Sequence, residues 1–198
     1  MISRASALAD LPASSEANAR AVLSEHRNGS ILQITAWPNT DGRVRTVITE
    51  LLELRVPLTG SAVVQDGATV AAIAPGRYLV ASGADDLSQR FQAALGSADG
   101  SVTDLTHGRT IFRLHGDVAT AVLAKGVALD LDLAAFPPGR VAQTMMHHVD
   151  VVVHRLAEQS FELWTLRSFA EALGEWLLEA GLEFGVVFTG DLATSSAA

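Results

Sequence analysis

The sequence predicts an α+β fold made of two ferredoxin-like β-α-β-β-α-β halves. Two observations predict it. Apolar, β-branched runs alternate with segments of helical periodicity, and this order of elements occurs twice along the 198 residues. The expected organisation is an N-terminal arm over residues 1–30, a first α/β half over 31–107 and a second half over 108–198.

The first half takes its boundaries from hydrophobic spacing and from proline and glycine. Apolar residues at helical spacing from Val44 onward predict a helix that ends before Pro57. In the arm, a short helix is expected over 17–25. The expected elements of the first half are a strand over 31–37, a helix over 41–55, strands over 69–74 and 78–82, a helix over 85–95 and a strand over 102–105.

The second half is expected to repeat this order. Gly116 and Asp117 should begin its first helix, with Asp117 as the cap. Ser168 and Glu171 have the spacing of a capping box at the start of its last helix. The expected elements are a strand over 110–114, a helix to residue 125, an extended segment over 140–147, strands over 149–155 and 161–166, a helix from 168 to 180, and a strand over 184–188.

The composition excludes several classes of partner. A formal net charge of −8 with scattered basic residues disfavours nucleic acid and a basic membrane-binding patch. No apolar stretch predicts a signal peptide or a membrane helix, so a cytoplasmic location is expected. Apolar residues make up 48% of the chain and charged residues only 18%. Such a chain either buries apolar surface against a partner or forms a compact core rich in Ala and Val.

Motifs for chemistry are missing from the sequence. It contains neither the Gly-x-Gly-x-x-Gly motif nor the Gly-x-x-x-x-Gly-Lys-Ser/Thr motif that bind phosphate groups. It also contains no Gly-x-Ser-x-Gly motif, which would place a nucleophilic serine in a sharp turn. His147 and His148 are expected to be adjacent in a strand, where their side chains would point to opposite faces. Asp130 and Asp132 are expected in a solvated loop. We therefore expect no catalytic residue, no cofactor-binding residue and no metal ligand on this chain.

Two arginines stand at predicted element boundaries. Arg140 follows Pro137-Pro138-Gly139, and Arg167 precedes the Ser168 cap. The planar guanidinium fork of either one could bind a carboxylate or carbonyls across an interface. Local capping of backbone carbonyls is the other interpretation, and the sequence leaves both open.

Several blocks of the sequence resemble the gamma subunit family of heterotetrameric sarcosine oxidase. The most specific block combines Phe136-Pro137-Pro138-Gly139 with Gln143-Thr144, and Arg167-Ser168-Phe169-Ala170 and Trp176-Leu177 follow it. The other blocks are Asp104 to Thr110, Arg113 to Gly116, Ala121 to Gly126, Leu129 to Leu131 and Val151 to Arg155, with weaker similarity at Trp37-Pro38 and Pro75 to Val80. Val127-Ala128 and Val141 depart from the pattern of that family, which leaves open the complex to which the chain belongs.

The resemblance implies a fold similar to the folate-binding domain of the glycine cleavage T-protein. It implies a non-catalytic subunit without a cofactor of its own, beside alpha, beta and delta partner subunits that hold FAD, FMN, NAD and tetrahydrofolate. The whole enzyme would convert sarcosine to glycine with release of hydrogen peroxide and of formaldehyde or methylenetetrahydrofolate.

Three alternatives stay open at this point. The chain could serve a related N-methyl amino acid dehydrogenase or oxidase, act alone as a folate-binding aminomethyltransferase-like module, or be a metal-dependent enzyme built on histidines. For the subunit interpretation, the loop from Phe136 to Arg140 is the expected interface because its prolines would hold an exposed aromatic ring in place. The interface candidates are Phe136, Pro137, Pro138, Gly139, Arg140, Arg167 and Trp176.

Overall fold

The computed structural model describes residues 6–11, 13 and 18–192. The chain divides into two compact units. One comprises residues 28–106, and the other combines residues up to 27 with those from 107 onward. We call them the middle unit and the terminal unit. None of the helices in the described part of the chain is long and apolar enough to cross a membrane.

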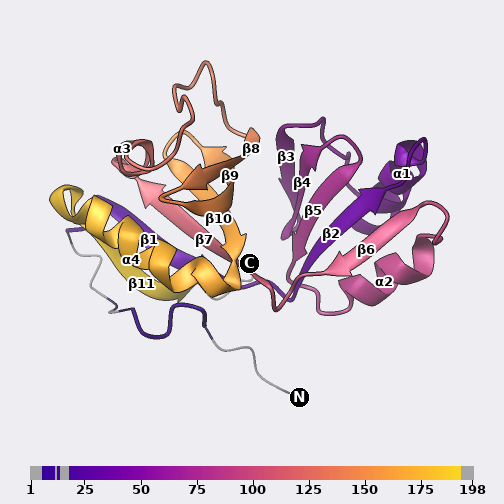
Figure 1. The fold of residues 1–198 in the computed structure, drawn as a ribbon, viewed down its shortest axis with the longest axis horizontal. Helices are drawn as coiled ribbons and strands as arrows, with labels where there is room; N and C mark the ends of the chain where they lie inside the picture. Colours follow the sequence, from indigo (N-terminus) through magenta and orange to yellow (C-terminus); the bar gives the residue numbers. More distant parts are fainter. Residues whose placement is uncertain (1–5, 12, 14–17, 193–198) are drawn as a thin grey trace. The chain divides into compact units, whose positions relative to one another are not determined.

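The middle unit is a five-stranded antiparallel sheet with two helices (Figure 1). The strand order is β3-β4-β5-β2-β6. Its elements are β2 (Ser30–Ala36), α1 (Asp41–Leu52), β3 (Ser61–Gln65), β4 (Ala68–Ala74), β5 (Arg77–Ser82), α2 (Leu87–Ala94) and β6 (Gly100–Asp104). Both helices cover the same sheet face, where Val47 and Phe91 pack with Leu32, Ile34 and other buried residues in one core.

The terminal unit is a six-stranded sheet in the order β11-β1-β7-β10-β9-β8. Its elements are β1 (Ala21–His26), β7 (Arg109–Gly116), α3 (Ala119–Ala124), β8 (Val141–Met146), β9 (Val149–Ala157), β10 (Ser160–Leu166), α4 (Ala170–Gly181) and β11 (Val186–Leu192), with short 3-10 turns at Arg167–Phe169 and Leu182–Phe184. Helices α3 and α4 lie on one face (Figure 1). Leu123 and Leu173 on these helices share a core with Phe112 and Leu163 on the strands.

The two units have the same plan. The middle order β3-β4-β5-β2-β6 corresponds strand by strand to β8-β9-β10-β7-β11 in the terminal unit, except that β1 lies between β7 and β11. Because β1 pairs antiparallel with β7 and parallel with β11, the direction of β11 relative to β7 matches that of β6 relative to β2. The expected α+β class with two related halves is therefore confirmed. Each unit has one more strand than predicted, β3 in the middle unit and β1 in the terminal unit.

The N-terminal prediction was wrong in one respect. Where a helix was expected over 17–25, residues 21–26 form strand β1; residue 17 lies outside the described residues. Leu23 is buried on the helix-covered face, while Val22 and Ser24 alternate to the other face. Residues 21–26 therefore do not belong to a separate N-terminal arm, which was expected over 1–30. They form β1, an internal strand of the terminal sheet.

Two predicted helix caps are also absent. Helix α3 has Val118 at its cap position, and Asp117 instead forms an ion pair with Arg20, with Arg20 Nη2 2.8 Å from Asp117 Oδ2. Helix α4 begins after a 3-10 turn, so Phe169 occupies the cap position and no side chain caps it. The extra turn moves Ser168 out of the register that a capping box with Glu171 needs.

Candidate functional site

The predicted interface loop is held from inside by a buried arginine. The guanidinium of Arg155 donates to the carbonyl oxygens of Leu131 at 2.9 Å, Phe136 at 2.7 Å and Glu158 at 2.6 Å. Its carbon Cζ lies 5.0 Å from the centre of the Phe161 ring. All of these hydrogen bonds go to backbone carbonyls, and they fix the loop before β8 to the β9–β10 hairpin.

Phe136 does not have its expected role. Its side chain is only 5% exposed and belongs to the core of the terminal unit, so it anchors the loop instead of presenting an aromatic ring. Pro137, Pro138 and Arg140 are exposed. Gly139 has a φ of 82°, and its N–H donates to the carbonyl of Arg155 at 2.7 Å. The positive φ explains why a glycine follows the two prolines.

Arg167 and Trp176 lie away from this loop. Arg140, at the end of the loop, pairs through its backbone with Arg155, which lies beside the start of β10, whereas Arg167 follows the end of β10. The seven residues of β10 separate them by about 20 Å. Trp176 is half-buried on α4, and its ring stacks on His147 with the ring centroids 5.3 Å apart. The seven predicted residues therefore do not form a single cluster.

The two adjacent histidines are in a turn and not in a strand as expected. His147 and His148 form the two-residue connection between β8 and β9, with φ values of 44° and 69°. Two positive φ values in such a loop match a type I′ hairpin. Their ring centroids are 5.5 Å apart. Among the described residues, no group of three His, Cys, Asp or Glu side chains is placed to hold a metal ion.

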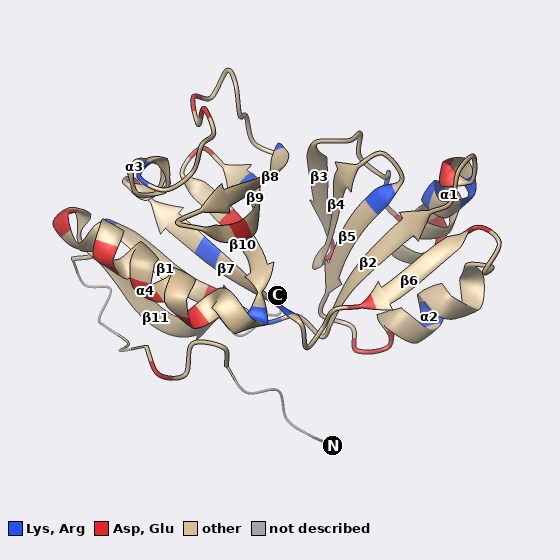
Figure 2. Ribbon diagram, in the orientation of Figure 1, with Lys and Arg blue, Asp and Glu red and all other residues tan. Residues whose placement is uncertain are grey.

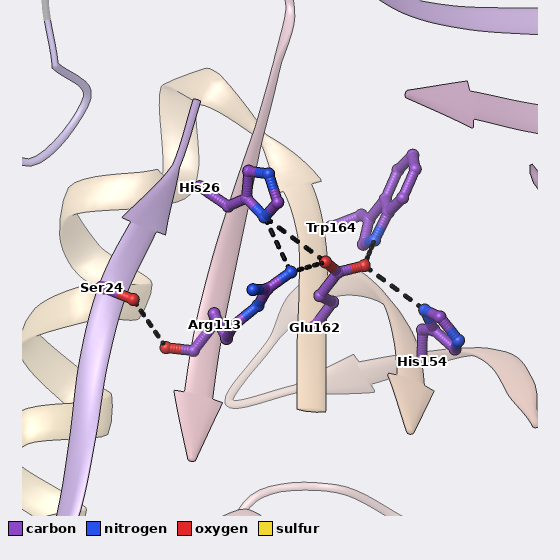
Figure 3. Close-up of polar contacts among 6 residues, drawn as sticks. All are labelled: Ser24, His26, Arg113, His154, Glu162 and Trp164. Carbon is purple, nitrogen blue, oxygen red and sulfur yellow. Dashed lines mark hydrogen bonds and ion pairs between the residues drawn. The ribbon is translucent and has the colours of Figure 1, made fainter. Parts of the chain in front are cut away.

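A buried polar cluster on the six-stranded sheet was not predicted. Glu162 on β10 is 2% exposed and lies directly opposite Arg113 of β7 on one side and His154 of β9 on the other. Figure 3 shows Arg113, His154, His26 and Trp164 turned toward its carboxylate. Their positions place the cluster on the sheet face away from α3 and α4, because neighbouring Leu163 points into the helix-covered core.

The hydrogen bonds of Glu162 use both carboxylate oxygens. Arg113 Nη2 donates to Oε1 at 2.8 Å, and Oε2 accepts from His154 Nδ1 and Trp164 Nε1, each at 3.3 Å. His26 Nδ1 lies 3.5 Å from Oε1 but only 2.9 Å from Arg113 Nη2. Since an arginine only donates, we assign an accepting Nδ1 to His26 and a donating Nδ1 to His154.

The charge of Glu162 is stabilised despite its burial. Burial by itself raises the pKa of this carboxyl group, but the hydrogen bonds from His154 and Arg113 outweigh it and hold the pKa well below its usual range. The group is therefore an ionised carboxylate across the physiological pH range. An ionised carboxylate that accepts three hydrogen bonds and has a strongly lowered pKa is a poor general acid or base, so this arrangement favours a structural role.

The sequence carried only a weak signal for this cluster. Glu162 and His154 interrupt apolar strands, yet their meeting depends on the register of β9, β10 and β7, which no local pattern gives. A separate pocket of about 430 Å³ at the end of the same sheet includes Arg109 and Asp150. Burial lowers the pKa of Arg109, and the negative charge of Asp150 opposes that shift.

Comparisons with known proteins agree with this fold. The model of the GCVT N-terminal domain family matches residues 43–197. Sarcosine oxidase subunit gamma of Corynebacterium sp. (strain U-96) is 33% identical over 119 residues, which is 60% of this chain and 58% of that protein. The same subunit of Arthrobacter sp is 32% identical over 120 residues, 60% of this chain and 59% of that protein. The matches thus span about three-fifths of the curated relatives.

Two solved structures are similar over most of the chain. A chain of heterotetrameric sarcosine oxidase from Corynebacterium sp. U-96, in complex with pyrrole 2-carboxylate, superposes with a TM-score of 0.77 at 28% identity, covering 85% of this chain and 88% of that chain. Glycine cleavage system aminomethyltransferase T from Bartonella henselae gives a TM-score of 0.60 at 18% identity, covering 86% and 48%. The second likeness shows a shared fold alone.

Proposed function

Because the chain belongs to the GCVT N-terminal domain family, we propose that it is the gamma subunit of a heterotetrameric sarcosine oxidase. The observation that carries the proposal is the TM-score of 0.77 to a chain of such an enzyme, with 88% of that chain covered. The two sarcosine oxidase gamma subunits, each at least 32% identical, support it from the sequence.

In this proposal the chain is a structural subunit and its partners perform the reaction. Alpha, beta and delta subunits would hold FAD, FMN, NAD and tetrahydrofolate in the cytoplasm. Sarcosine, oxygen and water would give glycine, formaldehyde and hydrogen peroxide, and tetrahydrofolate would take up the one-carbon unit as methylenetetrahydrofolate when present. A related N-methyl amino acid is the alternative substrate.

The arrangement around Glu162 disfavours a stand-alone folate-binding module. Such a module needs a buried acid with free acceptor positions for the amino groups of a pterin ring. Glu162 is a buried acid, but Arg113, His154 and Trp164 already donate to its two oxygens. Three of the roughly four acceptor positions of this carboxylate are thus occupied, which leaves few for a pterin ring, and no step of the reaction is assigned to this cluster.

The interface remains part of the proposal in a revised form. The buried Phe136 ring and Arg155 hold the loop in place. The exposed residues Pro137, Pro138 and Arg140 would then contact the partner subunit. Arg167 and Trp176 would contribute at separate places on the terminal unit. A loop fixed before binding loses little conformational entropy on assembly, which favours such a contact.

An omission experiment tests the proposed function. The chain is co-expressed with the alpha, beta and delta subunits of the proposed complex, and sarcosine-dependent hydrogen peroxide formation is measured with and without it. We expect the flavin-bearing complex to lose most of its activity or its integrity when the chain is omitted. Full activity and full assembly without the chain would refute the proposal. Parallel assays with other N-methyl amino acids identify the substrate.

A further inference from the structure

Strand β3 is an open edge of the middle sheet. It pairs with β4 through a two-residue turn in which Asp66 has a φ of 49° and Gly67 a φ of 74°. In such a hairpin the residue pair next to the turn is hydrogen-bonded, and along the strands hydrogen-bonded pairs then alternate with pairs that are not hydrogen-bonded. Gln65 and Val63 therefore bond to β4, whereas the N–H and C=O groups of Ala62 and Val64 point outward. Within the described middle unit, these outward groups form no backbone hydrogen bond.

This edge lacks the features that usually protect one. The five residues Ser-Ala-Val-Val-Gln contain no charge and no proline, and the pairing with β4 has no bulge. Two large apolar side chains at the edge are exposed, Val64 by 52% and Leu58, just before the strand, by 78%. An uncharged edge with exposed apolar side chains tends to pair with another strand.

A pocket of about 650 Å³ lies at the start of this strand. Its lining includes Trp37, Leu58, Thr59 and Tyr78. The indole of Trp37 is held in place, because its Nε1 donates to the carbonyl of Ser97 at 2.9 Å. The pocket therefore offers a fixed aromatic wall and an exposed leucine directly beside the open edge.

The charges in this pocket compensate each other. The Tyr78 hydroxyl donates to Asp41 Oδ1 at 2.6 Å and accepts from Arg45 Nη1 at 3.1 Å. Arg45 also donates to the carbonyl oxygens of Pro57 at 3.0 Å and Val56 at 2.7 Å. One carboxylate and one guanidinium are thus joined through a buried hydroxyl. A net-neutral pocket with apolar walls favours an uncharged occupant.

From these observations we propose that a partner subunit adds an extended, uncharged segment to β3 as a sixth strand of the middle sheet. The segment pairs with the outward groups of Ala62 and Val64 and places an apolar side chain in the pocket beside Trp37 and Leu58. Main-chain hydrogen bonds would supply affinity, and the pocket would supply specificity. This inference rests on the proposed function, because it takes the partner from the other subunits.

A second copy of the chain fits the same edge less well. In a two-fold antiparallel pairing, the strand end beside Ser61 would meet the Gln65 end of the other copy. That end turns back at Asp66 and Gly67, so it stops short of the pocket. It would also bring the carboxylate of Asp66 toward Asp41. A partner segment without a turn at this point would reach the pocket, and a segment without charge would avoid repulsion from Asp41.

Matched variants of the full chain test the inference. Val64→Lys places a charge on the edge, and Leu182→Lys makes the same kind of change at a 73% exposed leucine in the terminal unit. Each is co-expressed with the other subunits, and the amount of complex is measured together with the thermal unfolding of the isolated chain. We expect at least a tenfold loss of complex for Val64→Lys, none for Leu182→Lys, and similar unfolding temperatures for both.

Amide hydrogen exchange in the wild-type complex provides the second measurement. Exchange at Ala62 and Val64 should slow at least tenfold when the partner subunits are present. Full assembly by Val64→Lys together with unchanged exchange at Ala62 would overturn this inference and leave the proposed function intact. Slow exchange in the isolated chain that increases with its concentration would assign the edge to a second copy and also overturn it. Failure of the wild-type chain to join any complex would overturn both proposals.

Discussion

Arg113 and Glu162 face each other across the β7–β10 ladder, with Arg113 Nη2 2.8 Å from Glu162 Oε1. His154 takes the corresponding position on β9. Three neighbouring strands thus carry one row of polar side chains, two of which are almost completely buried. Figure 2 shows blue and red segments within the otherwise tan strands of the terminal sheet, and Figure 3 labels the residues of this row. The row fixes the register of three strands, because a slip of one residue would leave a buried charge without its partner.

Replacing Glu162 by Gln should destabilise the fold strongly. The change keeps the shape of the side chain but leaves Arg113 opposite a neutral group, and breaking a buried pair typically costs about 3–5 kcal/mol. We expect a loss of about 3 kcal/mol in the free energy of unfolding, measured by urea titration. Glu171→Gln, at an exposed position of α4, is the control and should change it by less than about 0.5 kcal/mol. An equal effect of both changes would contradict the buried role of Glu162.

The same carboxylate predicts an acid dependence of stability. The folded-state pKa of Glu162 is lowered, so its contribution is fully present above its unfolded pKa of about 4.3 and is lost as the pH falls toward the folded value. Urea titrations between pH 7 and pH 3 should therefore show a steeper loss for the wild type than for Glu162→Gln. Parallel curves for the two proteins would mean that Glu162 has an ordinary pKa.

Arg155→Lys should release the loop before β8. A lysine carries one charged nitrogen and cannot reach the carbonyls of Leu131, Phe136 and Glu158 together. We expect a destabilisation of about 2–4 kcal/mol, because buried carbonyls lose their donors, and faster proteolysis within residues 129–140. Limited proteolysis followed by mass spectrometry locates the cuts. Unchanged protection of that loop would show that Arg155 does not hold it.

Gly126→Ala should displace the ring of Trp176. A Cβ atom on Gly126 would overlap the indole, whereas one on Gly42, inside helix α1, would meet no atom within 4 Å. We expect Gly126→Ala to shift the tryptophan emission and to lower stability by about 1–3 kcal/mol. Gly42→Ala is the matched control and should raise stability by about 0.5–1 kcal/mol. Equal stability changes would indicate that the Trp176 ring moves at no cost.

The sequence predicted most regular elements of the fold, and its failures have physical causes. Strand β3 was missed although Asp66-Gly67 between short apolar runs is a strong hairpin signal. A helix was predicted over 17–25 because the pairing of residues 21–26 with β7 and β11 is non-local and leaves no local pattern. Phe136 was expected at the surface, but the buried Arg155 turns the loop so that its ring enters the core. The Glu162 cluster depends on register, which local patterns do not contain.

The mass of the assembled complex tests the central claim most directly. The chain is co-expressed with tagged alpha, beta and delta subunits of the proposed complex, and the purified material is measured by native mass spectrometry. We expect one species that contains this 20.8 kDa chain together with one copy of each other subunit. Recovery of the tagged subunits as a complete complex without this chain, while the chain runs separately as a monomer, would contradict it.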